Sequence, residues 1–241
     1  MIGRLAPCLA ALLLAGPLAA QNPRDTLRFG GTIGFVQTAG NTEVVTLNVG
    51  EELTYRAERV VLRQSFSTVY GRSEGETNAS SWRAGARADY RFSPRVAAFA
   101  RLGFDRDRFA GISRRLEEGV GLALTALSRP RDLLEIEAGA DLVQQRTTLA
   151  TGETFLSGRS ALRYTHRFGA GEQPYFQQTV ELLPNLERID DYRLNAETLL
   201  VAPLSRQLGL KLSYSIRLDN VPEPGFARTD RVLSSALQIT L

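Results

Sequence analysis

The sequence predicts an all-β chain that forms a single antiparallel transmembrane-type β-barrel of about twelve strands. Three observations lead to this prediction. Apolar and polar residues alternate along most of the chain after residue 20, turn-forming residues separate the alternating segments, and short connections alternate with longer ones. No amphipathic helical pattern competes, and no linker or low-complexity stretch divides the chain. Residues 21–241 are therefore expected to form one barrel domain.

Residues 1–20 differ from the rest of the chain and have the pattern of a secretory signal peptide. Arg4 supplies a positive start, an apolar run from Leu5 to Ala20 follows, and small residues stand at its end. A helical membrane anchor needs about 20 apolar residues, and this run is shorter and interrupted by proline. Cys8, the only cysteine, lies inside this segment. The mature chain is therefore expected to be exported and to contain no disulfide or thiolate metal site.

The alternating segments predict the strands one by one. Around Trp82 the apolar and polar residues fall on opposite parities, as do those around Leu212, and a period of two places them on opposite faces of a strand. The twelve predicted strands start near Leu27, Glu43, Arg59, Ala79, Arg95, Arg115, Arg131, Ser157, Pro174, Asp191, Arg206 and Arg228.

The connections support a membrane barrel with both termini on the periplasmic side. Even-numbered connections are short, as in Ser93-Pro94, and odd-numbered ones after the first are longer: 71–78, 105–114, 146–156, 184–190 and 219–227. Outer-membrane barrels have short periplasmic turns and longer external loops. A β-sandwich has no reason to produce this rhythm.

A soluble barrel would point its apolar residues inward, whereas a membrane barrel points them toward lipid. Aromatic residues near the proposed strand ends, such as Tyr90, Phe92 and Phe168, favour the membrane barrel because they resemble interfacial girdles. About twelve strands also exceed what a small soluble barrel needs to fill its interior.

Under this assignment the inward parity carries charges of both signs. A charge removed from water must be paired or solvated, so these residues predict either a salt-bridged network or a path for small solutes. The candidate lumen charges are Arg83, Arg87, Asp89, Arg101, Glu135, Glu137, Asp141, Arg163, Arg193, Glu197, Lys211 and Arg217, with Arg63 and Arg167 on the same parity.

Composition excludes several classes of function. The 29 basic and 26 acidic residues give a net charge of +3, which gives no electrostatic support to nucleic-acid binding. His166 is the only histidine, so no metal site with several histidines is expected, and no cofactor motif is found. A barrel-embedded lipid-acting enzyme would need a nucleophile and a base, for which His166 is the only candidate base. It lacks a neighbouring serine and is expected to be interfacial rather than catalytic.

The segment Asp105, Arg106, Asp107, Arg108 and Phe109 is a candidate external loop for binding a cation or a polar ligand. Because the arginines would neutralise the two carboxylates, a salt-bridged loop that holds Phe109 against its neighbours is the stronger expectation. The acidic residues Glu187, Asp190 and Asp191 are likewise expected to form a solvated loop.

Several segments resemble one bacterial family, the domain of unknown function 481, which includes proteins named as salt-induced outer-membrane proteins. The most specific is residues 104–112, followed by Gly119-Val120-Gly121-Leu122; weaker matches are residues 39–42, 89–93 and 220–225. The resemblance covers nearly the whole mature chain and implies an outer-membrane barrel of unassigned activity. It supplies no catalytic residues.

Together these observations predict a non-enzymatic barrel in the outer membrane of a Gram-negative bacterium. Its role would be envelope integrity or the passage of small solutes, and its expected partners are the lipid bilayer and the barrel-assembly machinery. A lipid-acting enzyme and a ligand- or cation-binding surface protein that uses its external loops stay as alternatives.

Overall fold

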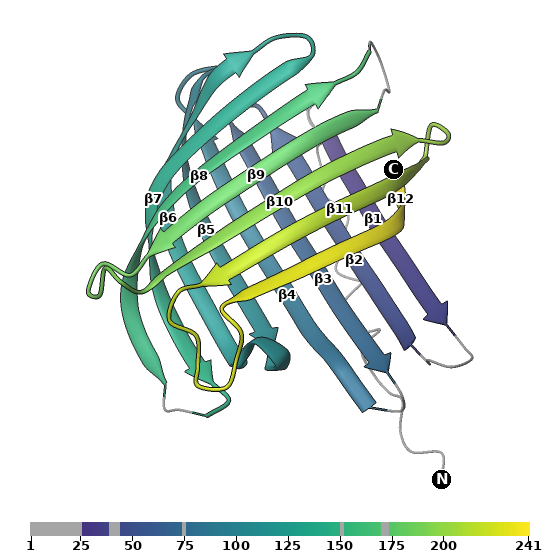
Figure 1. Ribbon diagram of the computed structural model, residues 1–241. Helices are drawn as coiled ribbons and strands as arrows, with labels where there is room; N and C mark the ends of the chain where they lie inside the picture. The colour runs from purple at the N-terminus through teal and green to yellow at the C-terminus, as the bar shows by residue number, and fades with distance from the viewer. Residues whose placement is uncertain (1–25, 39–43, 74–75, 150–151, 170–173) are drawn as a thin grey trace, which may run out of the picture.

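The computed structural model describes residues 26–38, 44–73, 76–149, 152–169 and 174–241. Within them, antiparallel strands form a closed barrel in which sequence neighbours pair and β1 meets β12 (Figure 1). The strands are β1 Thr26–Thr38, β2 Val44–Ala57, β3 Val60–Ser73, β4 Glu76–Arg91, β5 Val96–Asp107, β6 Ile112–Ser128, β7 Asp132–Thr147, β8 Glu153–Arg167, β9 Tyr175–Pro184, β10 Tyr192–Pro203, β11 Leu208–Asp219 and β12 Thr229–Thr240. The predicted signal peptide and first loop lie outside the described residues.

The predicted strands are confirmed, and their starts lie close to the observed ones. The largest difference is at β8, which begins at Glu153, whereas alternation predicts a start at Ser157. No helix in the described ranges is long and apolar enough to cross a membrane.

The apolar parity faces outward. On β6, Val120, Leu122 and Leu124 are 64%, 58% and 45% exposed, whereas the intervening Gly119 is buried. A soluble barrel would show the opposite order, because burial of its apolar side chains is what stabilises it. The exterior therefore has the apolar band of a membrane barrel.

The core lies inside the barrel, on the side formed by β3 to β10. Val61, Phe99, Val143 and Leu183 point inward and are almost completely buried. They pack among charged side chains of the same parity, so apolar contacts and ion pairs fill this part of the lumen together.

The connections differ less in length than the sequence predicts. Only residues 74–75 separate β3 from β4, and 108–111 separate β5 from β6, because the strands continue pairing into the predicted loops. The β9–β10 and β11–β12 connections, 185–191 and 220–228, are long as expected. The β8–β9 connection, 168–174, is as long as 185–191, although a short turn is predicted there.

The barrel closes through a short seam. Residues Gly30–Ile33 of β1 pair with Leu237–Thr240 of β12, whereas β1 pairs with β2 from Thr26 to Thr38. The two closing strands diverge beyond this seam (Figure 1). A Cβ atom at Gly34 would collide with the backbone oxygen of Ser235, so glycine permits the close crossing at which pairing ends.

Candidate functional site

The centre of the lumen is a network of ion pairs around Glu137 of β7. Its carboxylate lies 2.9 Å from Nη2 of Arg87 on β4 and 2.6 Å from Nη1 of Arg159 on β8. The Arg87 contact spans strands that are not neighbours in the barrel. Glu137 is therefore bound by one arginine from the neighbouring strand β8 and by another from the more distant strand β4.

The network continues around the wall in both directions. Asp89 binds Arg87 at 2.8 Å and Arg63 at 2.6 Å, and Arg159 binds Glu181 at 2.8 Å. The guanidinium carbon of Arg87 also lies 4.1 Å from the centre of the Phe99 ring, in the range of a cation–π contact. We call Arg63, Asp89, Arg87, Glu137, Arg159 and Glu181 the central network.

A second cluster joins strands across the lumen. It lies nearer than the central network to the end of the barrel at which β5 turns into β6. Arg101 of β5 donates from Nε to Asp141 at 2.9 Å, and it binds Glu117 of β6 at 3.1 Å. Glu117 also binds Arg193 of β10 at 2.8 Å. A Cβ atom at Gly119 would collide with the Asp141 carboxylate, so this glycine makes room for the pair.

The candidate external loop is not a loop over its whole length, because Asp105 and Asp107 belong to β5. Both lie near Arg83 of β4, at 2.8 and 3.7 Å, and Asp107 also lies 3.7 Å from Arg217. Their side chains share one face because they are two residues apart in a strand.

Between β5 and β6 the chain makes a short 3-10 turn, Arg108–Ala110. Asp107 begins it by accepting a hydrogen bond from the Ala110 amide at 3.2 Å. Arg106 ends up in the strand and Arg108 in the turn. The side chain of Phe109 lies outside what the structure describes, so the expected packing of that ring stays a prediction.

Most of the predicted lumen charges lie in these clusters. Glu135 and Arg163 form a looser pair, with their charged atoms 3.8 Å apart. Glu197 and Lys211 have no ion pair among the described residues. Those that are paired are Arg83, Arg87, Asp89, Arg101, Glu135, Glu137, Asp141, Arg163, Arg193 and Arg217.

Sequence reasoning missed three residues of the clusters: Glu117, Arg159 and Glu181. Arg159 has the inward parity of Arg163, and this alternation could have identified it. Glu117 was harder to recognise because Glu118, which follows it, is also acidic but faces outward on β6.

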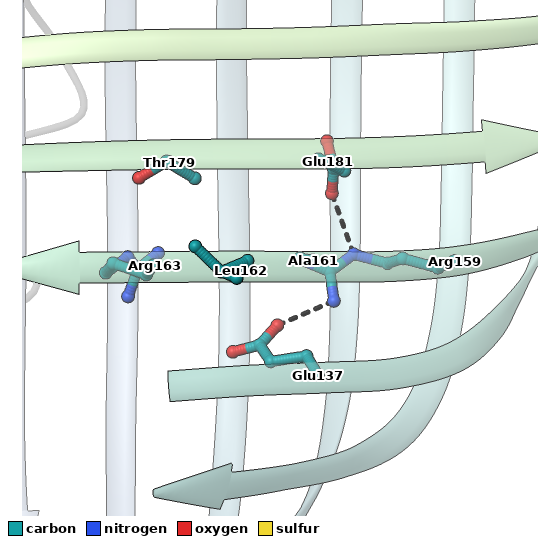
Figure 2. A pocket seen from close by; sticks show the side chains of 7 residues that line it. All are labelled: Glu137, Arg159, Ala161, Leu162, Arg163, Thr179 and Glu181. Atoms are coloured by element: carbon teal, nitrogen blue, oxygen red, sulfur yellow. Dashed lines mark hydrogen bonds and ion pairs between the residues drawn. The ribbon is translucent and has the colours of Figure 1, made fainter. Parts of the chain in front are cut away.

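A cavity of about 190 Å³ lies beside the central network, against β7, β8 and β9 (Figure 2). Its lining includes Glu137, Arg159 and Glu181, which are joined by ion pairs, and Arg163, which lies apart from them (Figure 2). The buried Nε of Arg163 has no hydrogen-bond partner in the described part of the chain.

The part of the lumen formed by β11, β12, β1, β2 and the middle of β3 carries many small side chains. Ser65 and Ser67 of β3 point inward and are exposed, and Ser213 of β11 lies 2.7 Å from Ser234 of β12 between hydroxyl oxygens. The inward residues of this wall include Gly30, Thr32, Gly34, Gly50, Ser65, Ser67, Ser213, Ser215, Ser234 and Ala236. The network thus fills one side of the lumen and leaves the other lined mainly by small side chains, among which Glu52, Lys211 and Gln238 also point inward.

His166 lies on the outer face of β8. Its Nδ1 is 2.8 Å from the Asp132 carboxylate, which also accepts a hydrogen bond from the Tyr164 hydroxyl at 2.7 Å. Its ring meets Phe168 edge to face with centroids 5.0 Å apart. The described contacts of His166 include no serine or threonine hydroxyl. Across the described ranges, no group of three or more His, Cys, Asp or Glu side chains could hold a metal ion.

Solved structures with a similar arrangement are outer-membrane porins and autotransporter domains. A KdgM porin is 6% identical, with a TM-score of 0.50 and coverage of 89% of this chain and 98% of the porin. A NanC porin is 9% identical, with a TM-score of 0.48 and coverage of 89% and 98%. The translocator domain of the autotransporter NalP from Neisseria meningitidis is 12% identical, with a TM-score of 0.46 and coverage of 90% and 87%. At such identities the likeness concerns the fold alone.

Curated protein sequences give no match. A family model described as "Protein of unknown function, DUF481" matches residues 31–240, which is nearly the whole barrel. The chain therefore belongs to the DUF481 family, and its fold is a closed β-barrel with the apolar exterior of a membrane barrel.

Proposed function

We propose that this barrel provides a narrow aqueous path for small polar solutes across the outer membrane of a Gram-negative bacterium. The observation that carries the proposal is the division of the lumen into two sides. Ion pairs and apolar side chains occupy the wall from β4 to β10 and the part of β3 with Val61 and Arg63, whereas Ser65 and Ser67, further along β3, point inward and stay exposed.

The lining also suits this role chemically. Glycine, serine and threonine leave space, and their polar groups can replace part of the water around a passing solute. Glu197 points inward, is exposed and lacks an ion pair among the described residues, so it adds a hydrated charge to the path. Export by residues 1–20 and insertion by the barrel-assembly machinery belong to the same proposal.

A structural role in the envelope is the second candidate, and the ion pairs of the central network and of the second cluster favour it. Glu137 and Glu117 each bind two arginines, and such cross-links stiffen a barrel. A lipid-acting enzyme has less support, because His166 has an acid partner but no adjacent hydroxyl nucleophile. Loop-based cation binding has less support too, because Arg83 pairs with both Asp105 and Asp107.

Planar-bilayer recordings of the refolded protein test the passage of solutes. We expect discrete conductance steps, and we expect Ser67→Tyr to lower the conductance several-fold because the ring would fill the open side of the lumen. Thr68→Tyr is the matched control, since Thr68 is the next residue of β3 and faces outward.

A folded barrel without conductance steps would contradict the proposal and leave the structural role. Heat-modifiable gel mobility verifies folding of each variant. Equal conductance of Ser67→Tyr and the parent protein would show that the path does not run along β3.

A further inference from the structure

The end of the barrel at which the chain enters β1 and leaves β12 carries a group of arginines. Arg28 of β1, Arg56 of β2 and Arg91 of β4 have the inward parity, and Arg59 stands in the β2–β3 turn. The Arg91 amide donates to the Arg59 carbonyl oxygen at 2.8 Å, which holds the turn against β4. We call these four residues the arginine mouth.

A cavity of about 490 Å³ opens at the arginine mouth. Thr26, Arg56, Glu58, Arg59 and Arg91 line it, and none of these side chains is apolar. Its size falls in the range of small-molecule sites, roughly 300–1,000 Å³, but such sites are usually mostly apolar. A polar lining of this kind favours a small hydrophilic ligand over an acyl chain.

The four arginines of the arginine mouth form no ion pairs with their neighbours in the described part of the chain. Arg28 pairs with Thr54, the inward neighbour of Arg56 on β2, so two like charges lie close together. Among the described residues no ion pair joins Arg28, Arg56, Arg59 or Arg91 to a carboxylate. Glu58 lines the same cavity, but it is exposed and unpaired in the described part.

The arginines in the middle of the lumen differ from these four, because they are paired with acids. There Arg87 and Arg159 bind carboxylates at 2.6–2.9 Å. Like charges gathered without ion pairs repel one another, and a bound anion relieves that repulsion. The guanidinium group is planar and donates two parallel hydrogen bonds to a carboxylate or phosphate.

We propose that the arginine mouth is an anion-binding site for small solutes that carry phosphate or carboxylate groups. Its binding role stands on the cavity and the unpaired arginines. Its second role, to make the path prefer anions, rests on the proposed function. Lipid phosphate could supply the same chemistry, so the experiment separates lipid from dissolved anion.

The binding test uses inorganic pyrophosphate and the full-length barrel folded in a neutral detergent, with titration calorimetry as the readout. Arg56→Gln with Arg91→Gln is expected to weaken binding about tenfold or more, because each arginine supplies a charge-assisted hydrogen bond. Arg95→Gln with Arg206→Gln is the matched control, since both stand in turns at the same end but do not line the cavity. Equal affinity of the parent protein and the Arg56/Arg91 variant would overturn the site.

Nanodiscs of neutral phosphatidylcholine, with or without phosphatidylglycerol, identify the source of the anion. Unchanged pyrophosphate affinity in the presence of phosphatidylglycerol would support a dissolved ligand. Competition by phosphatidylglycerol would support the anion site but overturn its assignment to solutes.

Reversal potentials in a KCl gradient test the selectivity. The parent barrel is expected to prefer chloride, and the Arg56/Arg91 variant is expected to lose that preference. A conducting barrel with the same selectivity in both proteins would overturn the second role alone. A silent barrel that still binds pyrophosphate through these arginines would overturn the proposed path and leave the anion site standing.

Discussion

At the scale of single residues, Glu137 is the point on which the central network depends. It is nearly buried and binds two arginines that come from β4 and β8. Loss of its charge would leave Arg87 with Asp89 and Arg159 with Glu181, so each guanidinium group would keep one of its two acids. The lost hydrogen bonds join charged groups in a confined space, and such bonds are worth more than those between neutral groups.

We therefore expect Glu137→Gln to lower the free energy of unfolding by about 1.5–3 kcal/mol, because each guanidinium group loses one of its two charged partners. Denaturant titration of the vesicle-folded protein, followed through the fluorescence of its single tryptophan, Trp82, would measure this. Glu153→Gln is the control, because Glu153 pairs with Arg188 at the exposed surface, where a pair is worth about 0–1 kcal/mol. Similar losses in the two variants would show that burial of the network contributes nothing.

At the scale of elements, the β1–β12 seam is the junction at which the fewest residues pair between two neighbouring strands of the described barrel. Register pairing stops after Ile33 and Leu237, and Gly34 lies where the two strands cross. A backbone N–H or C=O group without a hydrogen bond costs free energy in lipid. The few paired residues of the seam must therefore hold β1 and β12 together.

Gly34→Ala is expected to destabilise closure by about 1–3 kcal/mol, because the added methyl group collides with backbone rather than with a movable side chain. A smaller heat-modifiable fraction on gels would report it. Gly31→Ala on the same strand meets only the Phe29 ring at 3.4 Å, an ordinary contact, and should behave like the parent protein. Full closure of the Gly34 variant would contradict this reading of the seam.

The sequence predicted the strands, and the face to which each residue points, well. Alternation assigns each residue a face, so strands such as β6 and the inward position of Arg87 could be found directly. Alternation does not say which inward residues meet. Arg87 reaches Glu137 across non-neighbouring strands, and that contact depends on strand tilt and register around the whole barrel. The arginine mouth was missed for the same reason, since its members come from β1, β2, β4 and a turn.

At the scale of the whole molecule, the exposed apolar exterior requires a lipid environment. Leu122 lies in the middle of β6 and points outward. Arginine at the bilayer midplane on the outside of a barrel costs about 2–4 kcal/mol.

Leu122→Arg is therefore expected to lower the stability of the protein in lipid vesicles by that amount, measured by the same denaturant titration. Leu186→Arg is the control: Leu186 is also exposed but belongs to the β9–β10 connection, and a change of less than about 0.5 kcal/mol is expected there. No loss in the Leu122 variant would mean that this face does not meet lipid.

The ion pairs across the lumen also have a consequence for the order of events during folding. Arg87 and Glu137 are 50 residues apart in sequence, and Glu117 and Arg193 are 76 apart. Hairpins can form from local contacts, but these pairs can meet only when the sheet has curled far enough to bring distant strands face to face. We therefore expect these ion pairs to form late in folding and to stabilise the finished barrel. Their loss would speed opening of the finished barrel and leave the rate of its formation nearly unchanged.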